Sequence, residues 1–168
     1  FSYEEWLDGL KRGRSFVTTG PMLFAKVNGQ LPGTTITLDR DGGEVTINGE
    51  VISETPVSFL EIVVNGQPVL KVRARPKATP SGAHQITFSA ELPIKTSGWI
   101  AVRCFEERHG GRLRFAHTGQ WTVNVPGKPL RPSPEEKEYL IERVQVEIHR
   151  SKGIVSAEAL AEYNAALS

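Results

Sequence analysis

Alternating hydrophobic and polar positions fill the middle of the chain and predict β-strands. In residues 44–52, Val45, Ile47 and Val51 fall on one face and polar residues fall on the other. Further strands are predicted at residues 22–27, 35–38, 57–64, 69–72, 86–92, 99–105, 112–116 and 121–125. Asn-Gly and Pro-Gly turns separate several of these runs. Many short strands joined by turns, with no helix between them, predict an antiparallel β-sandwich.

Both ends of the chain carry helix signals instead. Ser2 and Glu5 have the spacing of a capping box, an apolar face follows, and Gly13 provides a stop. After a proline-rich linker at residues 127–134, Ser133 begins a second helix that ends at Gly153, and Ser156 caps a third. The fold class expected is therefore mainly β, with one N-terminal helix and two C-terminal helices.

The apolar faces of these helices need partners. Trp6, Leu7 and Leu10 share a face of the first helix, which starts at the first residues of a chain without an initiator Met. This pattern predicts the C-terminal portion of a longer protein. The second helix carries a stripe of Leu140, Val144 and Ile148. We expect that stripe to pack on the first helix, on a domain outside this chain, or on a second copy in a homo-oligomer.

The composition of the chain limits the partners and sites that it is expected to have. The 168 residues are 39% hydrophobic and 23% charged, with a formal net charge of +1, as in an ordinary globular domain. Such a charge predicts neither nucleic acid nor a membrane surface as a partner. Cys104 is the only cysteine, so an internal disulfide and a cysteine-based zinc site are excluded, and a small buried hydrophobe is expected.

Two motifs and their order carry a family resemblance. GRSFVTTGP spans residues 13–21, a Pro-Gly segment follows, and AHTGQWTVNV spans residues 116–125 before the last helices. This order resembles the C-terminal region of carbaryl-hydrolase-like metallohydrolases, which are built on a PHP (polymerase and histidinol phosphatase) barrel. The chain departs from the family at Thr19, where asparagine is usual, and at residues 119–121, where the family has a Ser-Pro-aromatic run.

The resemblance implies a division of the chain and of the chemistry. Residues 1–21 would end the upstream PHP-like barrel, residues 22–126 would form an Ig-like sandwich, and residues 127–168 would be a linker and helices. The barrel of the same polypeptide would be the partner and would hold divalent zinc or manganese. In such a protein the barrel performs metal-dependent hydrolysis, and this chain alone is expected to be inactive.

The residues of this chain agree with a non-catalytic role. Its four histidines, at positions 84, 109, 117 and 149, have no spacing that would bring metal ligands to one face. No nucleophile elbow or phosphate-binding glycine loop is present in the sequence. We therefore expect no catalytic residue, metal site or cofactor in this chain.

Four residues are candidates to face the active site of the barrel: Arg14, Thr18, Thr19 and His117. Arg14 could clamp an anionic substrate group or the carboxyl end of the first helix. The alternative for the threonines is an ordinary strand hydroxyl. For His117 it is a structural bond to a backbone carbonyl at the sandwich edge.

Two further sets of residues suggest an autonomous binding module, for carbohydrate or another ligand. Trp99 and Trp121 could stack on a sugar, although their apolar surroundings favour the core. Two hairpins rich in Arg and Lys could bind an acidic polymer, but Glu106 and Glu107 dilute that charge and favour a solvated face. Helix faces that bury each other would favour this module, and exposed faces would favour the accessory sandwich.

Overall fold

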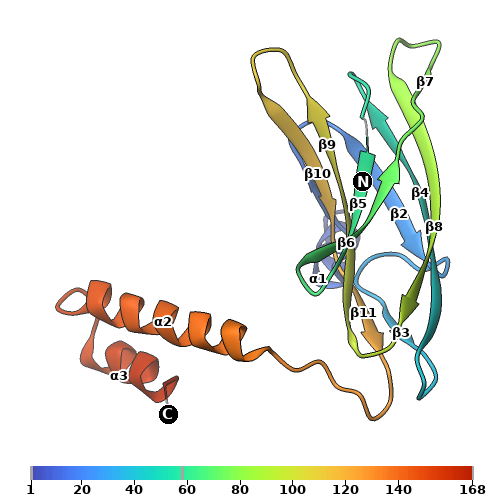
Figure 1. The fold of residues 1–168 in the computed structure, drawn as a ribbon. Coiled ribbons are helices and arrows are strands. Elements are labelled where there is room, and N and C mark those ends of the chain that lie inside the picture. Colours follow the sequence, from blue (N-terminus) through green and yellow to red (C-terminus); the bar gives the residue numbers. More distant parts are fainter. Residues whose placement is uncertain (1, 58, 168) are drawn as a thin grey trace. The chain divides into compact units, whose positions relative to one another are not determined.

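The computed structural model of the chain describes residues 2–57 and 59–167. Its internal contacts define two compact units, of which the first ends at Leu130 and the second begins at Arg131. The first unit holds α1 and all the described strands, and the second holds two helices (Figure 1). The boundary between the units falls within the predicted proline-rich linker.

The first unit is a sandwich of two sheets, which confirms the predicted Ig-like fold. The smaller sheet has the order β2-β4-β8-β7, formed by Met22–Val27, Gly43–Ser53, His84–Ile94 and Lys77–Ala78. In the larger sheet, β9 (Gly98–Glu107) pairs with β5 (Phe59–Val64), and β5 pairs with β6 (Gln67–Arg73). The other side of β9 pairs with β10 (Leu113–Thr118) and β11 (Trp121–Asn124). These two layers correspond to the two sheets of an Ig-type sandwich.

Two short strands complete the larger sheet. β1 (Phe16–Thr18) pairs antiparallel with β10, and β3 (Thr35–Thr37) pairs parallel with β11. β1 therefore lies at an edge of the larger sheet, and β2 lies at an edge of the smaller one. These two edges bound the candidate site described below.

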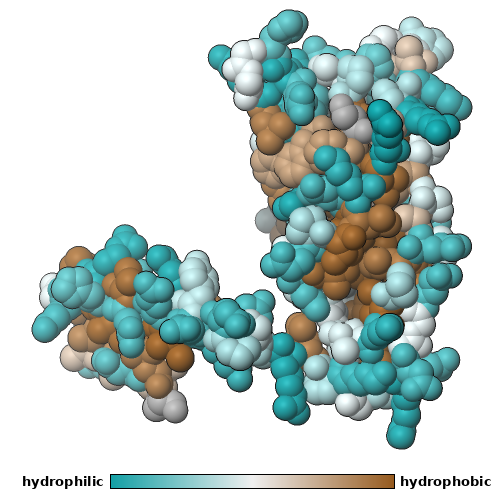
Figure 2. Space-filling model, in the orientation of Figure 1, coloured by the Kyte–Doolittle hydropathy of each residue, from teal (hydrophilic) through white to brown (hydrophobic). Residues whose placement is uncertain are grey.

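The core lies between the sheets and follows the predicted alternation. Val45, Ile47 and Val51 are fully buried. On the face of the sandwich around β5 and β6, hydrophobic residues occupy the middle, and hydrophilic residues occupy both ends of that face (Figure 2). There Leu70 and Val72 are partly buried against the core. The two-faced pattern of each strand thus specifies which side chains are enclosed.

Cys104 lies in this core and provides a test of its packing. Burial raises the pKa of its thiol to about 11, so almost none of it is thiolate, the reactive form, at neutral pH. We expect the native protein to resist an aromatic disulfide reagent at pH 8, whereas protein in denaturing urea reacts within minutes with one equivalent per chain. Fast stoichiometric labelling of the native protein would contradict this packing.

The three predicted helices are present with their caps. In α1 (Tyr3–Lys11), the Ser2 hydroxyl accepts a hydrogen bond from the Glu5 amide at 3.3 Å. In α2 (Pro134–Ser151), Ser133 and Glu136 form a complete capping box. α3 (Ala157–Ala165) begins at the Ser156 cap. These local signals depend on few residues, which explains why the sequence locates them well.

The apolar faces of the helices remain largely exposed. No described residue of α1 is buried, and Tyr3, Trp6 and Leu10 are 63%, 49% and 43% exposed. In the second unit α2 packs on α3, yet Ser151 is the one buried residue of α2. Leu140, from the predicted stripe, is 57% exposed, while Val144 and Ile148 are half-buried. Each unit therefore presents hydrophobic surface.

Glu106 corrects an expectation from the sequence. We expected it on a solvated face, but it belongs to β9 and its side chain is only 1% exposed. It shares its face of the strand with the core residues Val102 and Cys104, because residues two apart point the same way. The Ser53 hydroxyl and the Arg108 guanidinium both donate hydrogen bonds to its carboxylate.

Candidate functional site

Thr18 and Thr19 hold the turn that connects β1 to β2. The Thr18 hydroxyl donates to the Pro21 carbonyl at 2.5 Å and accepts from the Gly20 amide at 2.9 Å. The Thr19 hydroxyl accepts from the Phe115 amide at 3.0 Å. Both hydroxyls are thus engaged by the backbone, which is the structural alternative considered for them.

His117 lies on the outer face of the larger sheet, opposite Val17 on β1 and Arg103 on β9. Its ring is half-buried, and Nδ1 donates a hydrogen bond to the Thr118 carbonyl at 2.7 Å. This bond fixes the orientation of the imidazole ring and engages Nδ1 but not Nε2. The sheet therefore separates His117 from the side chains of the core.

The two candidate stacking tryptophans lie on opposite sides of the larger sheet. Trp121 is fully buried, and its indole N–H donates to the Gln30 carbonyl at 2.9 Å. Trp99 pairs with Thr122, the neighbour of Trp121, and is half-exposed on the outer face. Because successive residues of a strand point to opposite faces, the two indoles cannot form one platform.

Much of the charge in one of the two basic hairpins, formed by β9 and β10, is neutralised locally. Arg103 binds Glu61 at 2.7 Å, and Arg108 binds both Glu106 and Glu54. Arg114 lies 3.7 Å from Glu54. The hydrogen bond and charge of Arg108 lower the pKa of Glu54. These pairs favour the solvated face over a site for an acidic polymer.

Three glycines bring the sequence motifs together at one point, which we call the glycine junction: Gly13, Gly33 and Gly119. A β-carbon on Gly33 would overlap the Arg12 carbonyl, and Gly33 has a φ of +83°. A β-carbon on Gly119 would overlap the Gly13 carbonyl, and the Gly119 amide donates to Ser15 at 2.7 Å. Backbone contacts thus attach the C-terminal end of α1 directly to the sandwich.

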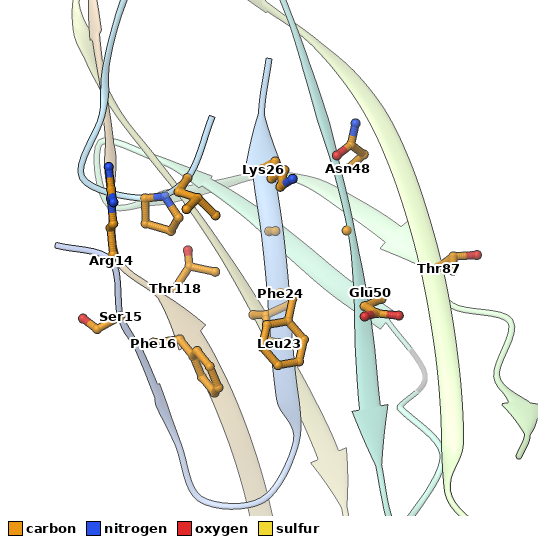
Figure 3. Close-up of a pocket in the computed structure, with 14 residues that line it drawn as sticks. Arg14, Ser15, Phe16, Leu23, Phe24, Lys26, Asn48, Glu50, Thr87 and Thr118 are labelled. Carbon is orange, nitrogen blue, oxygen red and sulfur yellow. The ribbon is translucent and has the colours of Figure 1, made fainter. Parts of the chain in front are cut away.

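Beside this junction lies a groove in the described surface. Its volume is about 700 Å³, and it runs between the free edge of β2 and the segment that leads into β1 (Figure 3). Its apolar walls are Phe16, Leu23, Phe24, Leu31 and Pro32. Volume and lining are those of small-ligand and peptide sites.

The groove has an aromatic end and a basic end. The rings of Phe16 and Phe24 meet edge to face at 5.6 Å. Arg14 and Lys26 lie toward the other end, on opposite sides (Figure 3). Within residues 2–57 and 59–167, neither of these cations forms an ion pair. Of the residues selected from the sequence, Arg14 alone lines this groove.

The other groove residues were missed, although the sequence holds a signal for them. Met22, Phe24 and Lys26 alternate with the core residues Leu23, Ala25 and Val27, so two large hydrophobic side chains point outward from β2. Exposed hydrophobic residues on an edge strand are unusual because natural proteins protect such edges. That combination makes this edge a candidate binding surface.

The described residues hold no group of three or more His, Cys, Asp or Glu side chains that could bind a metal ion. The four histidines belong to different places: β8, the turn after β9, β10 and α2. No described helix has the length and apolarity needed to cross a membrane. Comparison of the sequence with models of known protein families found no match, and comparison with curated proteins found none either.

Proposed function

We propose that this chain is a non-catalytic accessory sandwich of a PHP-type metal-dependent hydrolase, and that it packs against the barrel through α1. The observation that carries the proposal is the exposed face of Tyr3, Trp6 and Leu10 on a helix that is fastened to the sandwich. A contiguous apolar helix face of this kind is typical of a docking surface.

The glycine junction supports this role because it restricts how α1 can move. The helix end meets Gly33 and Gly119 through backbone atoms, and backbone contacts leave little room for a change of angle. The three segments involved are the ones on which the family resemblance depends. A rigid attachment would let the sandwich hold the last helix of a barrel in place.

In this proposal the chemistry belongs to the barrel. Zinc or manganese bound there would acidify a water molecule and polarise the scissile bond. The sandwich would stabilise the barrel and shape the mouth of its active site from the side of β1 and His117. We expect the 168-residue chain alone to hydrolyse neither phosphate esters nor carbamate esters with added zinc or manganese, and metal-dependent turnover would overturn the proposal.

Replacement of Trp6 by serine tests the docking face. In the 168-residue chain, Trp6→Ser should change the free energy of unfolding by about 0.5 kcal/mol or less, because the side chain is half-exposed. In a polypeptide that includes the sequence encoded upstream, the same change should cost about 2 kcal/mol or more. Urea denaturation followed by circular dichroism measures both values.

The matched control is Glu4→Ser, on the exposed polar side of the same helix. It should have little effect in either polypeptide. Equal small effects of Trp6→Ser in both would show that nothing in the longer protein covers this face. The upstream coding sequence should also contain His and Asp motifs of a PHP barrel, and their absence would contradict the family assignment while leaving the docking result to stand alone.

A further inference from the structure

We propose that the groove beside β2 binds an extended peptide that alternates apolar and acidic residues, by adding it as a strand to the free edge of β2. This inference does not depend on the barrel or on the family resemblance. It rests on the backbone of β2, on the shape of the groove and on its charge.

Backbone amides of β2 that have no partner among the described residues point into the groove. The Asn28 amide donates to Thr46 beside β4, whereas the Val27 amide turns away and donates to Gln30. Amides of a strand alternate in direction, so Leu23 and Ala25 also point away from β4. Both residues line the groove, where only 1% of Leu23 and 6% of Ala25 is exposed.

The groove runs along β2 for the length of a short additional strand. Its floor and near wall include the continuous stretch from Leu23 to Lys26, which covers about 13 Å at the usual strand rise. Its far wall is the segment from Arg14 to Phe16, where β1 is itself an edge strand. The close-up shows the lining side chains of both segments (Figure 3). An added strand would therefore lie between two unpaired edges.

The side chains on both faces of β2 define the preferred peptide. In an added strand, alternate side chains would lie beside Phe24 and Lys26 on the outer face, and the others would point inward toward the buried Thr118. Lys26 and Arg14 favour acidic residues at the outer positions. Glu50, the acidic residue in the lining, accepts a hydrogen bond from Gln85 at 2.8 Å. Apolar residues suit the inner positions.

The test uses the 168-residue chain and blocked five-residue peptides, with binding followed by backbone amide NMR. Acetyl-Val-Glu-Val-Glu-Val-amide should bind and should slow hydrogen exchange of the Leu23 and Ala25 amides at least tenfold at saturation. Acetyl-Val-Lys-Val-Lys-Val-amide should bind at least tenfold more weakly at low salt. The same acidic peptide with N-methylated valines should lose binding, because strand addition needs its amide groups.

The variant Arg14→Ala/Lys26→Ala should weaken binding of the acidic peptide about tenfold. Arg75→Ala/Lys77→Ala, which removes the same charge from another hairpin, should leave it unchanged. Three results would overturn the proposal: no binding at millimolar peptide, equal binding of the N-methylated peptide, or chemical-shift changes without protection of Leu23 and Ala25. The second result would instead indicate a site for small anionic amphiphiles.

Discussion

Replacement of Gly49 by alanine is expected to lower the free energy of unfolding by about 3 kcal/mol. Gly49 lies in β4 opposite Ala25 of β2. An added β-carbon would overlap the Phe24 carbonyl and lie 2.8 Å from the Ala25 Cα and 2.9 Å from the Phe88 ring. Two of these neighbours are backbone atoms of the paired strand β2, so they cannot move aside without disrupting the β2–β4 pairing.

Gly43→Ala is the matched control in the same strand. Its β-carbon would meet only the Leu38 side chain, at 3.6 Å, which is an ordinary contact. This substitution should change stability by about 0.5 kcal/mol or less. Urea denaturation of both variants, followed by tryptophan fluorescence, gives the comparison. Equal stabilities would show that the approach of β2 to β4 is looser than the structure describes.

Replacement of Glu106 by alanine should cost about 3 kcal/mol at pH 7. The variant removes a buried carboxylate and leaves the Ser53 hydroxyl and part of the Arg108 guanidinium without their acceptor. Removing the acceptor lowers the stability of the fold because the donor atoms that remain stay desolvated without a hydrogen-bond partner. Glu107→Ala, at the exposed neighbouring position, should have almost no effect in the same denaturation experiment.

The same carboxylate should make stability depend on pH. Burial opposes ionisation of Glu106, but the hydrogen bonds from Ser53 and Arg108 outweigh it, and its pKa lies below the ordinary value. Because the folded pKa is lowered, its contribution is complete above the ordinary glutamate pKa of about 4.3 and is lost as pH falls further. The stability difference between the native chain and Glu106→Gln should therefore shrink between pH 5 and pH 3, measured by denaturation at each pH. A constant difference would contradict this role.

The sandwich and the helices could be predicted because their signals are local. The alternation at Val45, Ile47 and Val51 predicts that one face of the strand is buried, and this prediction does not require knowing which strands pair with it. The Ser133 capping box is complete within four residues. Neither kind of signal needs knowledge of distant parts of the chain. The same pattern placed Trp121 correctly in the core, but it also favoured the core for Trp99, which is half-exposed on the outer face of β9.

The site could not be predicted in the same way because it depends on distant segments. The groove is formed by Arg14, Phe24 and Leu31 from separate elements, and nothing in their spacing shows that they meet. Glu106 was expected on a solvated face because it and Glu107 dilute the positive charge of the nearby arginines. Its position two residues after Cys104 was the stronger signal, since both lie on the inner face of β9.

The glycine junction also orders the events of folding. Gly13 is among the first residues of the chain, but its contacts are with Gly33 and Gly119, and Gly119 follows all but one of the strands. α1 can therefore acquire its final position only after β10 has joined the sheet. The attachment of α1 to the sandwich would therefore wait until the sandwich is nearly complete, a delay set by the sequence distance between contacting residues. The helix that precedes the sandwich in the chain is thus among the last elements to be fixed to it.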